Sequence, residues 1–527
     1  MRITNSMISG NTKTNINSNK INVDKYNTQM TTQKKISRPS EDPVIAIRSL
    51  RLSTNLSHLN QYVENNIPDA DSWLDVTETA LTNMKSILTD IRTQCVKGSS
   101  DTLTADDRKT IMNALTSLSE QVYTEGNADY AGRTVFTGYR TSSQLTFGTD
   151  EDNTKYSITQ NFNYEDIEEK RYYTGTVEVP SLVQIDTDEI DPDNTTPDCD
   201  AQVEEKAYNR LRLAYGEIEA TTPAVAYDPD DPTQKRVTLS YTPAGGTTTT
   251  LTTSEGGGIA VYENEDAWEQ ANQKTFGTGD ADPQVVFIKS TGEFVMSDTF
   301  SAQLKSTKAT MEVNYDKTGF QAGDVRPEYY YDCKDISDPA NVVDYKKEDQ
   351  TLDYGIASGI TLTVNTQASD VFDTGIARDV TELMNAVSKA INANDKVDKI
   401  KAMMEEEAYK DPEYQAKLKT YYDAAKKEAD YADDNLQKTF GSGITKFNEY
   451  LGGVNDAITN VGSMQDRLSL TQTRVSNQQE TIKDLKSSNE DRDLSDIIID
   501  YYASYNAYQA SLTAASKVGT STLLDYL

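Results

Sequence analysis

The sequence predicts an α+β protein in which both chain ends form a long helical bundle or coiled coil around a β-rich insertion. Near both ends, apolar residues recur every seven positions, which is the pattern of helices packed along an a/d seam. Between residues 141 and 374 the pattern changes to short alternating strands separated by turn residues. At 527 residues the chain exceeds the size of one hydrophobic core, so we expect several structural parts.

The N-terminal seam predicts one long helix followed by a shorter one. Its two columns are Leu56, Val63, Ala70, Thr77, Met84 and Ile91, and Ile67, Leu74, Leu81, Leu88 and Cys95. A helix from about Val44 to Val96 would be roughly 80 Å long at 1.5 Å per residue, and Pro68 should kink it. The sequence Thr104-Ala105-Asp106-Asp107 resembles a capping box, so a second amphipathic helix should begin there.

The C-terminal seam is the stronger of the two. Its main column is Phe440, Phe447, Val454, Val461, Leu468, Val475 and Ile482. The lysine-, glutamate- and tyrosine-rich segment 395–438 precedes it and predicts a helical hairpin broken near Asp411-Pro412. We therefore expect residues 41–140 and 375–487 to form the core bundle, with 395–438 as a hairpin insertion.

The two terminal segments, 1–40 and 488–527, carry thinner apolar stripes. The stripe residues are Ile16, Val23, Met30, Leu494, Ile498, Tyr501, Tyr505, Tyr508 and Leu512. At ~1.5–3 kcal/mol per fully buried side chain, the N-terminal stripe cannot offset the ordering of some thirty residues at ~1–2 kcal/mol each. We expect both ends to be disordered in the monomer and to serve as assembly helices that need partners.

A proline-fixed elbow joins the first terminal segment to the bundle. Proline fixes φ and disfavours helical geometry in the residue before it, so Pro39 should end the preceding helix. We expect Ser40 to cap the next helix and Pro43 to occupy its first turn, where its missing N–H costs nothing. Pro39, Ser40 and Pro43 are therefore the predicted hinge residues.

The middle region predicts β-hairpins. Val237, Leu239 and Tyr241 alternate with polar residues, and Gly245-Gly246 is typical of a two-residue turn. The acidic segment Asp186–Asp200 could hold a cation, but its spacing does not match an EF-hand, and a solvated loop is favoured. The tyrosines of this region suit either packing or carbohydrate stacking, and the sequence does not separate these alternatives.

Composition excludes several functions. The formal net charge of −33 opposes binding to nucleic acids and to anionic membranes. His58 is the single histidine and lies in a helical pattern, so multi-histidine metal sites are impossible. No catalytic, cofactor or metal residues are predicted. The N-terminus lacks a secretory signal, and no apolar stretch is long enough to span a membrane.

Several short motifs lie near both chain ends. The N-terminal motifs are Arg2-Ile3-Thr4, Met30–Pro43, Leu103–Arg108 and Gly132–Thr141. The C-terminal ones are Val461–Leu468, Ala514–Lys517 and Leu523–Leu527. Together they resemble a known family, the bacterial flagellar hook-filament junction proteins (third hook-associated protein), which are flagellin-like. Flagellin shares the layout, but typically carries an Ala-Asp-Asp-Ala-Ala-Gly turn where this chain has Arg38–Pro43.

The resemblance implies a structural, non-enzymatic protein of the extracellular flagellum that joins hook to filament. It implies export through the flagellar type III channel without a cleaved signal peptide. The implied partners are other copies of the chain in a ring, a neighbouring hook-associated protein, flagellin and a cytoplasmic export chaperone. Three alternatives stay open, namely flagellin itself, a surface adhesin or glycan-binding module carried by the middle region, and an enzyme embedded there.

Overall fold

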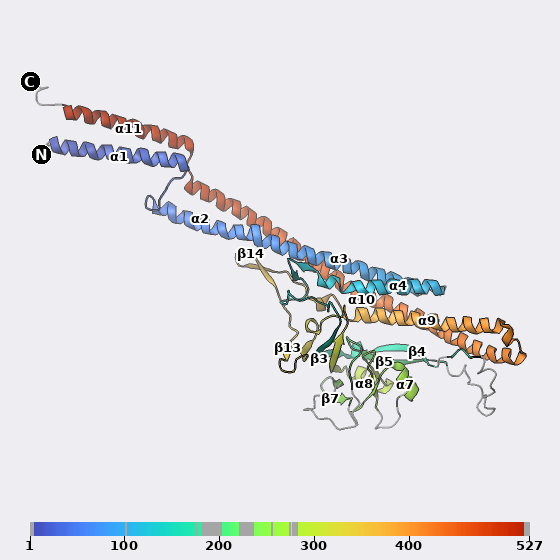
Figure 1. The fold of residues 1–527 in the computed structure, drawn as a ribbon. Helices are drawn as coiled ribbons and strands as arrows, with labels where there is room; N and C mark the ends of the chain where they lie inside the picture. The colour runs from blue at the N-terminus through green and yellow to red at the C-terminus, as the bar shows by residue number, and fades with distance from the viewer. Residues whose placement is uncertain are drawn as a thin grey trace, which may run out of the picture. The chain divides into compact units, whose positions relative to one another are not determined.

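The computed structural model describes residues 5–100, 103–174, 177–181, 203–220, 237–253, 257–272, 276 and 283–520. The α+β class is confirmed, with helices at both chain ends and β-sheets in the middle (Figure 1). Two compact units divide the chain. Unit 1 comprises Met1–Asp71, Asp353–Thr363 and Met464–Leu527, and unit 2 comprises Ser72–Leu352 and Val364–Ser463. The acidic segment 186–200 and the motifs at 2–4 and 523–527 lie outside the described residues.

Unit 1 is built from helices of both chain ends. They are α1 (Asn5–Thr32), α2 (Pro43–Gln61), the π-helix η1 (Tyr62–Asn66), the first turn of α3 (Ile67–Gly98), the end of α10 (Pro412–Glu490) and α11 (Leu494–Thr520). The helices α1 and α11 lie side by side (Figure 1). No helix among the described residues is long and apolar enough to cross a membrane.

The sequence predicts a kink at Pro68, and the structure has a π-turn immediately before this residue. The Ile67 N–H donates to the Tyr62 carbonyl, five residues earlier, so helix α2 passes through η1 into α3 without ending. Pro68 has no N–H, and its ring crowds the carbonyl four residues before it, so a wider turn at this point accommodates it. A two-stranded hairpin, β14 (Asp353–Ala357) and β15 (Ile360–Thr363), contacts this turn, where the Asn66 amide donates to the Gly355 carbonyl at 2.7 Å.

Unit 2 contains the rest of α3, together with α4 (Ala105–Val122), α9 (Gly375–Glu405) and the first part of α10. The capping box is confirmed, because the Asp107 N–H donates to the Thr104 hydroxyl at 3.2 Å and the Thr104 N–H to the Asp107 carboxylate at 3.1 Å. The heptad columns are confirmed from Ile67 onward, where they are buried. Leu56, Val63 and Ile482 are only half-buried, so both seams thin toward the chain ends.

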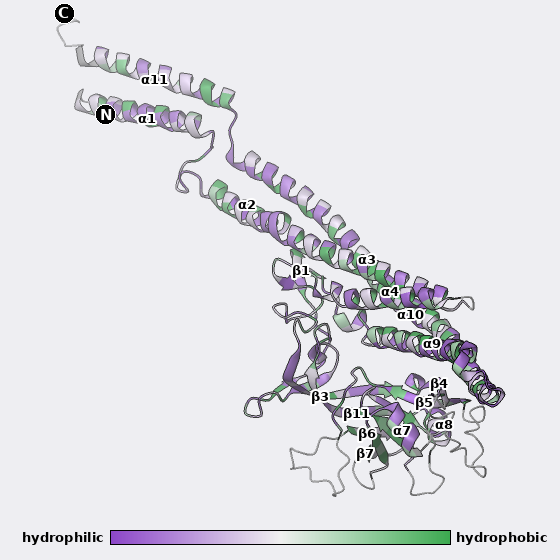
Figure 2. Ribbon diagram, turned by 45° about the vertical axis from the view of Figure 1, so that its right-hand side comes forward, coloured by the Kyte–Doolittle hydropathy of each residue, from purple (hydrophilic) through white to green (hydrophobic). Residues whose placement is uncertain are grey.

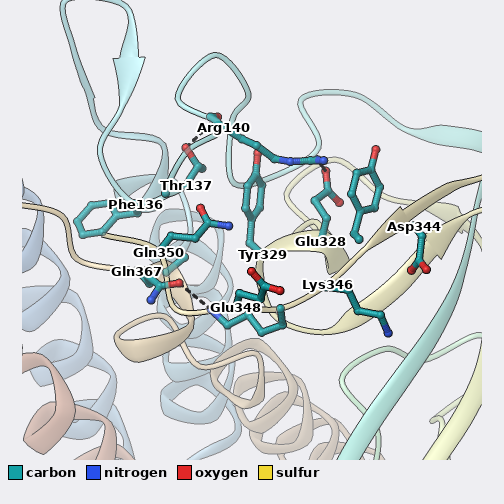
Figure 3. Close-up of a pocket in the computed structure, with 14 residues that line it drawn as sticks. Phe136, Thr137, Arg140, Glu328, Tyr329, Asp344, Lys346, Glu348, Gln350 and Gln367 are labelled. Atoms are coloured by element: carbon teal, nitrogen blue, oxygen red, sulfur yellow. Dashed lines mark hydrogen bonds and ion pairs between the residues drawn. The ribbon is translucent and has the colours of Figure 1, made fainter. Parts of the chain in front are cut away.

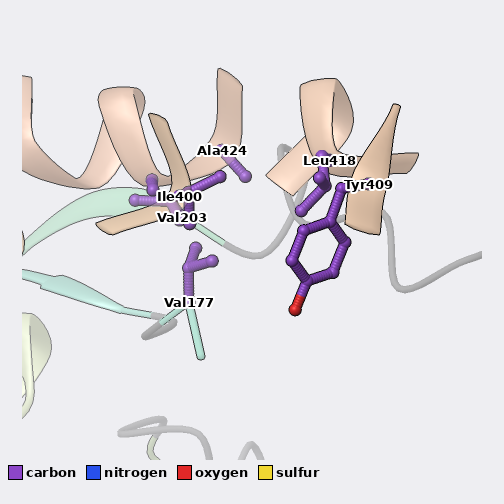
Figure 4. Close-up of a cluster of buried hydrophobic side chains, with 7 residues drawn as sticks. Val177, Val203, Ile400, Tyr409, Leu418 and Ala424 are labelled. Carbon is purple, nitrogen blue, oxygen red and sulfur yellow. The ribbon is translucent and has the colours of Figure 1, made fainter. Parts of the chain in front are cut away.

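The break near Asp411-Pro412 is confirmed, but α10 then continues from Pro412 to Glu490 as one helix. The turn between α9 and α10 packs in a hydrophobic cluster that also contains two residues of the middle region (Figure 4). The cluster residues are Val177, Val203, Ile400, Tyr409, Leu418, Ala424 and Ala425. The Val177 N–H donates to the buried Glu428 carboxylate at 2.8 Å, which fixes the backbone at Val177 to helix α10.

Two larger sheets fill the middle region. The antiparallel six-stranded sheet has the order β13 (Val343–Tyr345), β12 (Asp332–Asp335), β3 (Glu151–Asn163), β11 (Thr310–Phe320), β6 (Val237–Thr242), β7 (Thr249–Thr252). The five-stranded sheet has the order β4 (Glu168–Thr174), β5 (Glu204–Arg212), β10 (Glu293–Met296), β9 (Val285–Ile288), β8 (Ile259–Tyr262), with β8 and β9 parallel. The middle region also contains two short helices, α7 (Glu265–Asn272) and α8 (Asp298–Ser306). A pair of two-residue strands, β1 (Asp129–Tyr130) and β2 (Arg133–Thr134), precedes this region.

The predicted hairpin around Gly245-Gly246 is present, but its two-residue turn is wrong. Strands β6 and β7 are joined by residues 243–248, and the Gly246 N–H donates to the Pro243 carbonyl at 2.9 Å. This is a four-residue β-turn with Pro243 at its first position and Gly245 at a φ of +75°. The turn needs a glycine at its third position, and Gly245 supplies it.

A buried ionic network joins the five-stranded sheet to the helices. Arg210 on β5, whose side chain is 4% exposed, contacts the carboxylates of Glu293 on β10 at 3.0 Å and Glu382 on α9 at 2.6 Å. Arg212 pairs with Glu382 at 3.4 Å and with Asp379 at 2.5 Å. Burial alone would raise the pKa of Glu382, but the nearby cations, Arg210 first, outweigh it and lower the pKa to about 2.

Candidate assembly surface

The elbow between α1 and α2 is longer than predicted. Helix α1 ends at Thr32, well before Pro39, and Gln33 adopts a positive φ of 56°. The next residues pair with the break between α10 and α11, where the Lys35 N–H donates to the Glu490 carbonyl at 2.6 Å and the Arg492 N–H donates to the Gln33 carbonyl at 3.0 Å. The elbow is therefore a short backbone pairing between the two chain ends.

The predicted N-cap at Ser40 is wrong. The cap is Asp42, whose carboxylate accepts the N–H groups of Val44 at 3.0 Å and Ile45 at 3.1 Å. Because Asp42 precedes Pro43, it is held in extended geometry, and an extended residue before a helix is the capping position. Ser40 and Pro39 lie in the turn before it. Pro43 lies in the first turn of the helix, as predicted, but is its first residue because the cap is Asp42.

Charged side chains reinforce this junction. The Lys34 ammonium contacts the Asp491 carboxylate at 2.5 Å and the Glu490 carboxylate at 3.2 Å. The hydrogen bond from Lys34 lowers the pKa of Asp491. The Lys34 side chain is 44% exposed, so the pair orients the elbow more than it stabilises it.

The interface between α1 and α11 is narrow and largely polar. From α1 it uses Ile16, Val23 and Met30, each half-buried. The Asn19 amide donates to the Ala507 carbonyl at 3.4 Å and to the Ser511 hydroxyl at 3.3 Å. On α11 the paired face carries Ile497, Tyr501, Ser504, Tyr508 and Ser511. Ile497 is the one fully buried residue described on α11, and sequence reasoning missed it.

The structure separates the predicted α11 stripe into two sets. Tyr501 and Tyr508 lie on the half-buried paired face. Leu494, Ile498, Tyr505 and Leu512 are 42%, 37%, 38% and 42% exposed, and the large apolar side chains Ile499 and Tyr502 beside them are also exposed. Figure 2 shows the hydrophobic turns at the N-terminal end of α11. The helix therefore carries more apolar surface than its pairing with α1 covers.

A second exposed apolar stripe lies on α2. Val44, Ile47 and Leu50 are 66%, 55% and 66% exposed, whereas Ala46 on the other side of the helix is buried. Arg48 follows Ile47 and Arg51 follows Leu50 along the helix. Neither arginine forms an ion pair with another of the described residues. This surface was not predicted from the periodicity of the seam.

The motif Phe136–Thr141 has a structural role in unit 2. It borders a cavity of about 210 Å³ (Figure 3). The Arg140 guanidinium lies 4.0 Å from the centre of the Tyr345 ring and 3.9 Å from the buried Glu328 carboxylate. Gly138 has a φ of +61°, and a Cβ there would lie 2.1 Å from the Gln350 side chain. The motif thus anchors the edge of the six-stranded sheet and requires glycine at this turn.

Comparison with known proteins supports the resemblance. Residues 3–141 match the bacterial flagellin N-terminal helical region. Flagellar hook-associated protein 3 of Escherichia coli is 29% identical over 120 residues, 23% of this chain and 38% of that protein, and the Salmonella typhimurium protein of the same name is 26% identical over 144 residues, 27% of this chain and 45% of that protein. A flagellin of Clostridium tyrobutyricum is 29% identical over 122 residues, 23% of this chain and 32% of that protein.

These matches span less than half the length of each curated relative. A solved putative flagellar hook-associated protein of Vibrio parahaemolyticus aligns over 86% of this chain and 100% of that chain, at 12% identity and a TM-score of 0.33, which is too low to support any conclusion. The predicted resemblance is confirmed by the sequence matches alone. Residues 3–141 of this chain are therefore similar to the bacterial flagellin N-terminal helical region, and part of the chain is similar to flagellar hook-associated protein 3 and to a flagellin.

Proposed function

We propose that the protein is a structural, non-enzymatic subunit of the extracellular flagellum that joins hook to filament. Its similarity to flagellar hook-associated protein 3, over 120 and 144 residues in two relatives, supports this function. We further propose that it is exported through the flagellar type III channel without a cleaved signal peptide. A neighbouring hook-associated protein, flagellin and a cytoplasmic chaperone are its proposed partners.

The observation that carries the proposal is the uncovered face of α11. Contiguous exposed apolar surface on a protein typically marks an interaction site. Leu494, Ile498, Tyr505 and Leu512 lie on one helix face that α1 does not cover. We infer that copies of the chain bury this face against each other in a ring, and that both terminal segments become ordered on assembly.

The α2 stripe has the properties of the opposing surface. It combines apolar side chains with Arg48 and Arg51, and helix α2 contains no acidic residue. The first turns of α11 combine apolar side chains with Asp496, and Asp493 immediately precedes them; both carboxylates are exposed and form no ion pair within the described part of the chain. Charge complementarity of this kind selects partners and register. We propose that α11 of one copy packs on α2 of its neighbour.

Disulfide crosslinking between copies tests this contact. Ile47→Cys and Ile498→Cys are introduced into separately tagged full-length chains that carry Cys199→Ser and retain the buried Cys95 and Cys333. Oxidation of the mixture under assembly conditions should give a crosslink that joins the two tags. The matched control replaces Ile498→Cys with Asn506→Cys, at an exposed polar position on the same helix. Equal crosslinking of both pairs, or none, would contradict the proposed contact.

The position of the protein on the flagellum distinguishes a junction protein from flagellin, the filament subunit. Immunogold labelling of flagella from the bacterium that encodes the chain should mark one narrow band between hook and filament. Labelling along the whole filament, or growth of long homopolymeric filaments from the purified protein, would favour flagellin instead.

The middle-region tyrosines weigh against a glycan-binding function. Six of them lie in the hydrophobic core, namely Tyr156, Tyr172, Tyr208, Tyr215, Tyr315 and Tyr329. Several of these rings pack edge-on or tilted against other aromatic rings, for example Tyr208 against Trp268 with ring centres 5.8 Å apart. A ring buried in this way offers no face to a sugar, so packing is the role that we propose for them.

A further inference from the structure

A second cavity in unit 2, of about 390 Å³, lies between helices and loops of that unit. Its walls are the C-terminal end of α4, the first two turns of α9, and the loops 214–217 and 321–325. The positive end of the α9 dipole is at this wall, and the N-cap residue Thr374 makes no side-chain capping bond. The proposed assembly function does not involve this cavity.

Lys317 reaches the cavity from the inner face of β11. From Thr310 to Lys317 the strand alternates, and Met311, Val313, Tyr315 and Lys317 are the buried positions of that stretch. Lys317 is 6% exposed, yet its ammonium donates no hydrogen bond and forms no ion pair within the described residues. The ammonium lies 5.7 Å from the centre of the Phe320 ring. Burial lowers the pKa of Lys317.

Arg378, in the first turn of α9, is a second cation without a carboxylate partner. Its guanidinium donates to the backbone carbonyls of Leu213, at 3.1 Å, and Thr291. Two of its five N–H donors are thereby used, and none of the described carboxylates lies within ion-pair distance. Burial, reinforced by the neighbouring Arg212, lowers the pKa of Arg378 to about 10. Buried cations are normally paired with an anion. The buried Lys317 and the half-buried Arg378 both lack a carboxylate partner among the described residues, so an anion in the cavity would compensate their charge.

The acidic residues that line the cavity do not supply the compensating negative charge. Glu120 and Glu217 are exposed. The Asp324 carboxylate accepts the Gln321 N–H at 2.9 Å and holds its own turn. Asp324 and Glu217 act on Lys317 only at a distance, without an ion pair.

We propose that this cavity binds a small oxyanion, such as inorganic phosphate or sulfate or the same group on a larger ligand, between the Lys317 ammonium and the Arg378 guanidinium. The ammonium offers three free donors and the guanidinium offers the rest of its fork. The bound oxyanion neutralises the two cations, which ties β11 to the start of α9.

Anion titrations of the full-length protein test the proposal. Phosphate, sulfate and acetate are added at constant ionic strength to protein in a chloride buffer, and binding is followed by calorimetry and by the melting temperature. Phosphate or sulfate should raise the melting temperature, and Lys317→Gln should weaken binding at least tenfold. Stronger binding of acetate than of phosphate would assign the site to carboxylate ligands and overturn the phosphate-type assignment.

Two control variants separate the site from general charge effects. Lys317→Arg keeps the charge and should retain binding within a few-fold, and Lys334→Gln, at an exposed position on β12, should bind as the wild type does. In chloride alone, Lys317→Gln should melt no lower than the wild type, because it removes an unpaired buried charge. Absence of binding by every anion, or equal binding by Lys317→Gln, overturns the proposal. If that variant does not fold, failure of the wild-type protein to broaden the ³¹P signal of phosphate does so.

Discussion

The paired terminal helices and the seam of the bundle are both helical, but they bury very different amounts of apolar surface. Among the described residues of α1 and α11, only Gln29 and Ile497 are buried. Along α10, by contrast, every position of the heptad column from Phe440 to Val475 is buried. The same seven-residue periodicity therefore accompanies a packed interface in one region and a nearly bare one in the other.

This difference means that periodicity locates an apolar stripe in the sequence. It does not show whether the stripe is buried within the chain or only against another chain. A buried side chain contributes about 1.5–3 kcal/mol, and each ordered residue costs about 1–2 kcal/mol. Within one chain, burial along the seam offsets the entropy lost on ordering its residues. The contacts between α1 and α11 are mostly half-buried, so these helices would need contacts with neighbouring copies to offset the same loss. This is the physical basis of the proposed assembly.

The largest expected effect comes from a charge placed in the seam. Leu468 is 1% exposed, and Leu470, two residues along the same helix, is 74% exposed. Leu468→Asp should lower the free energy of unfolding by about 4 kcal/mol or more, because it leaves a cavity and buries an unpaired carboxylate. Leu470→Asp should change it by less than about 0.5 kcal/mol. Equal melting temperatures for the two variants would refute the seam.

The next effect concerns the ionic network. Glu382 contacts Arg210 at 2.6 Å and Arg212 at 3.4 Å, so Glu382→Gln leaves two buried guanidinium groups short of a counter-charge. We expect a loss of about 3 kcal/mol at pH 7, measured by denaturant unfolding. A control at an exposed acid of α10, Glu480→Gln, should be nearly silent.

The pH dependence of this loss has a definite sign. The pKa of Glu382 in the folded protein, about 2, lies below its ordinary value of 4.5. A carboxyl with a lowered pKa stabilises the fold above its unfolded value and ceases to do so as the pH falls through the folded one. The difference between wild type and Glu382→Gln should therefore be full above pH 4.5 and shrink between pH 4.5 and 2. A difference that stays constant over that range would contradict this assignment.

A smaller effect is expected at the N-cap of α4. Thr104→Ala removes the hydroxyl that accepts the Asp107 N–H, and should cost about 1 kcal/mol. Thr104→Ser retains the hydroxyl and should cost much less. Thermal unfolding of both variants measures the difference, and a Thr104→Ala protein as stable as the serine variant would argue against the cap.

Much of the fold was predictable because local patterns determine it. The cap at Thr104, the buried columns beyond Ile67 and the break before Pro412 all follow from residues close in sequence. The ionic network was not predictable, because Arg210, Glu293 and Glu382 lie far apart in sequence and meet only through the fold. The Asp42 cap could have been found, since a residue before proline resists helical geometry.

The exposed face of α11 shows more clearly what could not be predicted from the sequence. On α11 two stripes, shifted by about one residue, both have helical spacing, one through Leu494, Ile498 and Tyr505 and the other through Ile497 and Ser504. Hydropathy selects the first stripe together with Tyr501 and Tyr508 of the second, and passes over the serines of the second. The structure places the second against α1, where Asn19 bonds to Ser511, and leaves the first exposed. The more apolar stripe is thus the one that its own chain does not cover.

The smallest expected change in monomer stability is at that exposed stripe. Tyr505→Asp combined with Leu512→Asp should leave the main thermal transition of the monomer within about 0.5 kcal/mol of the wild type, because both side chains are already well exposed. The same variant should fail to incorporate into flagella, since two carboxylates would have to be buried without partners. Asn506→Asp, at an exposed polar position of the same helix, is the matched control and should incorporate normally. A double variant that assembles like the wild type would mean that this stripe stays in solvent, and that copies of the chain meet through another face.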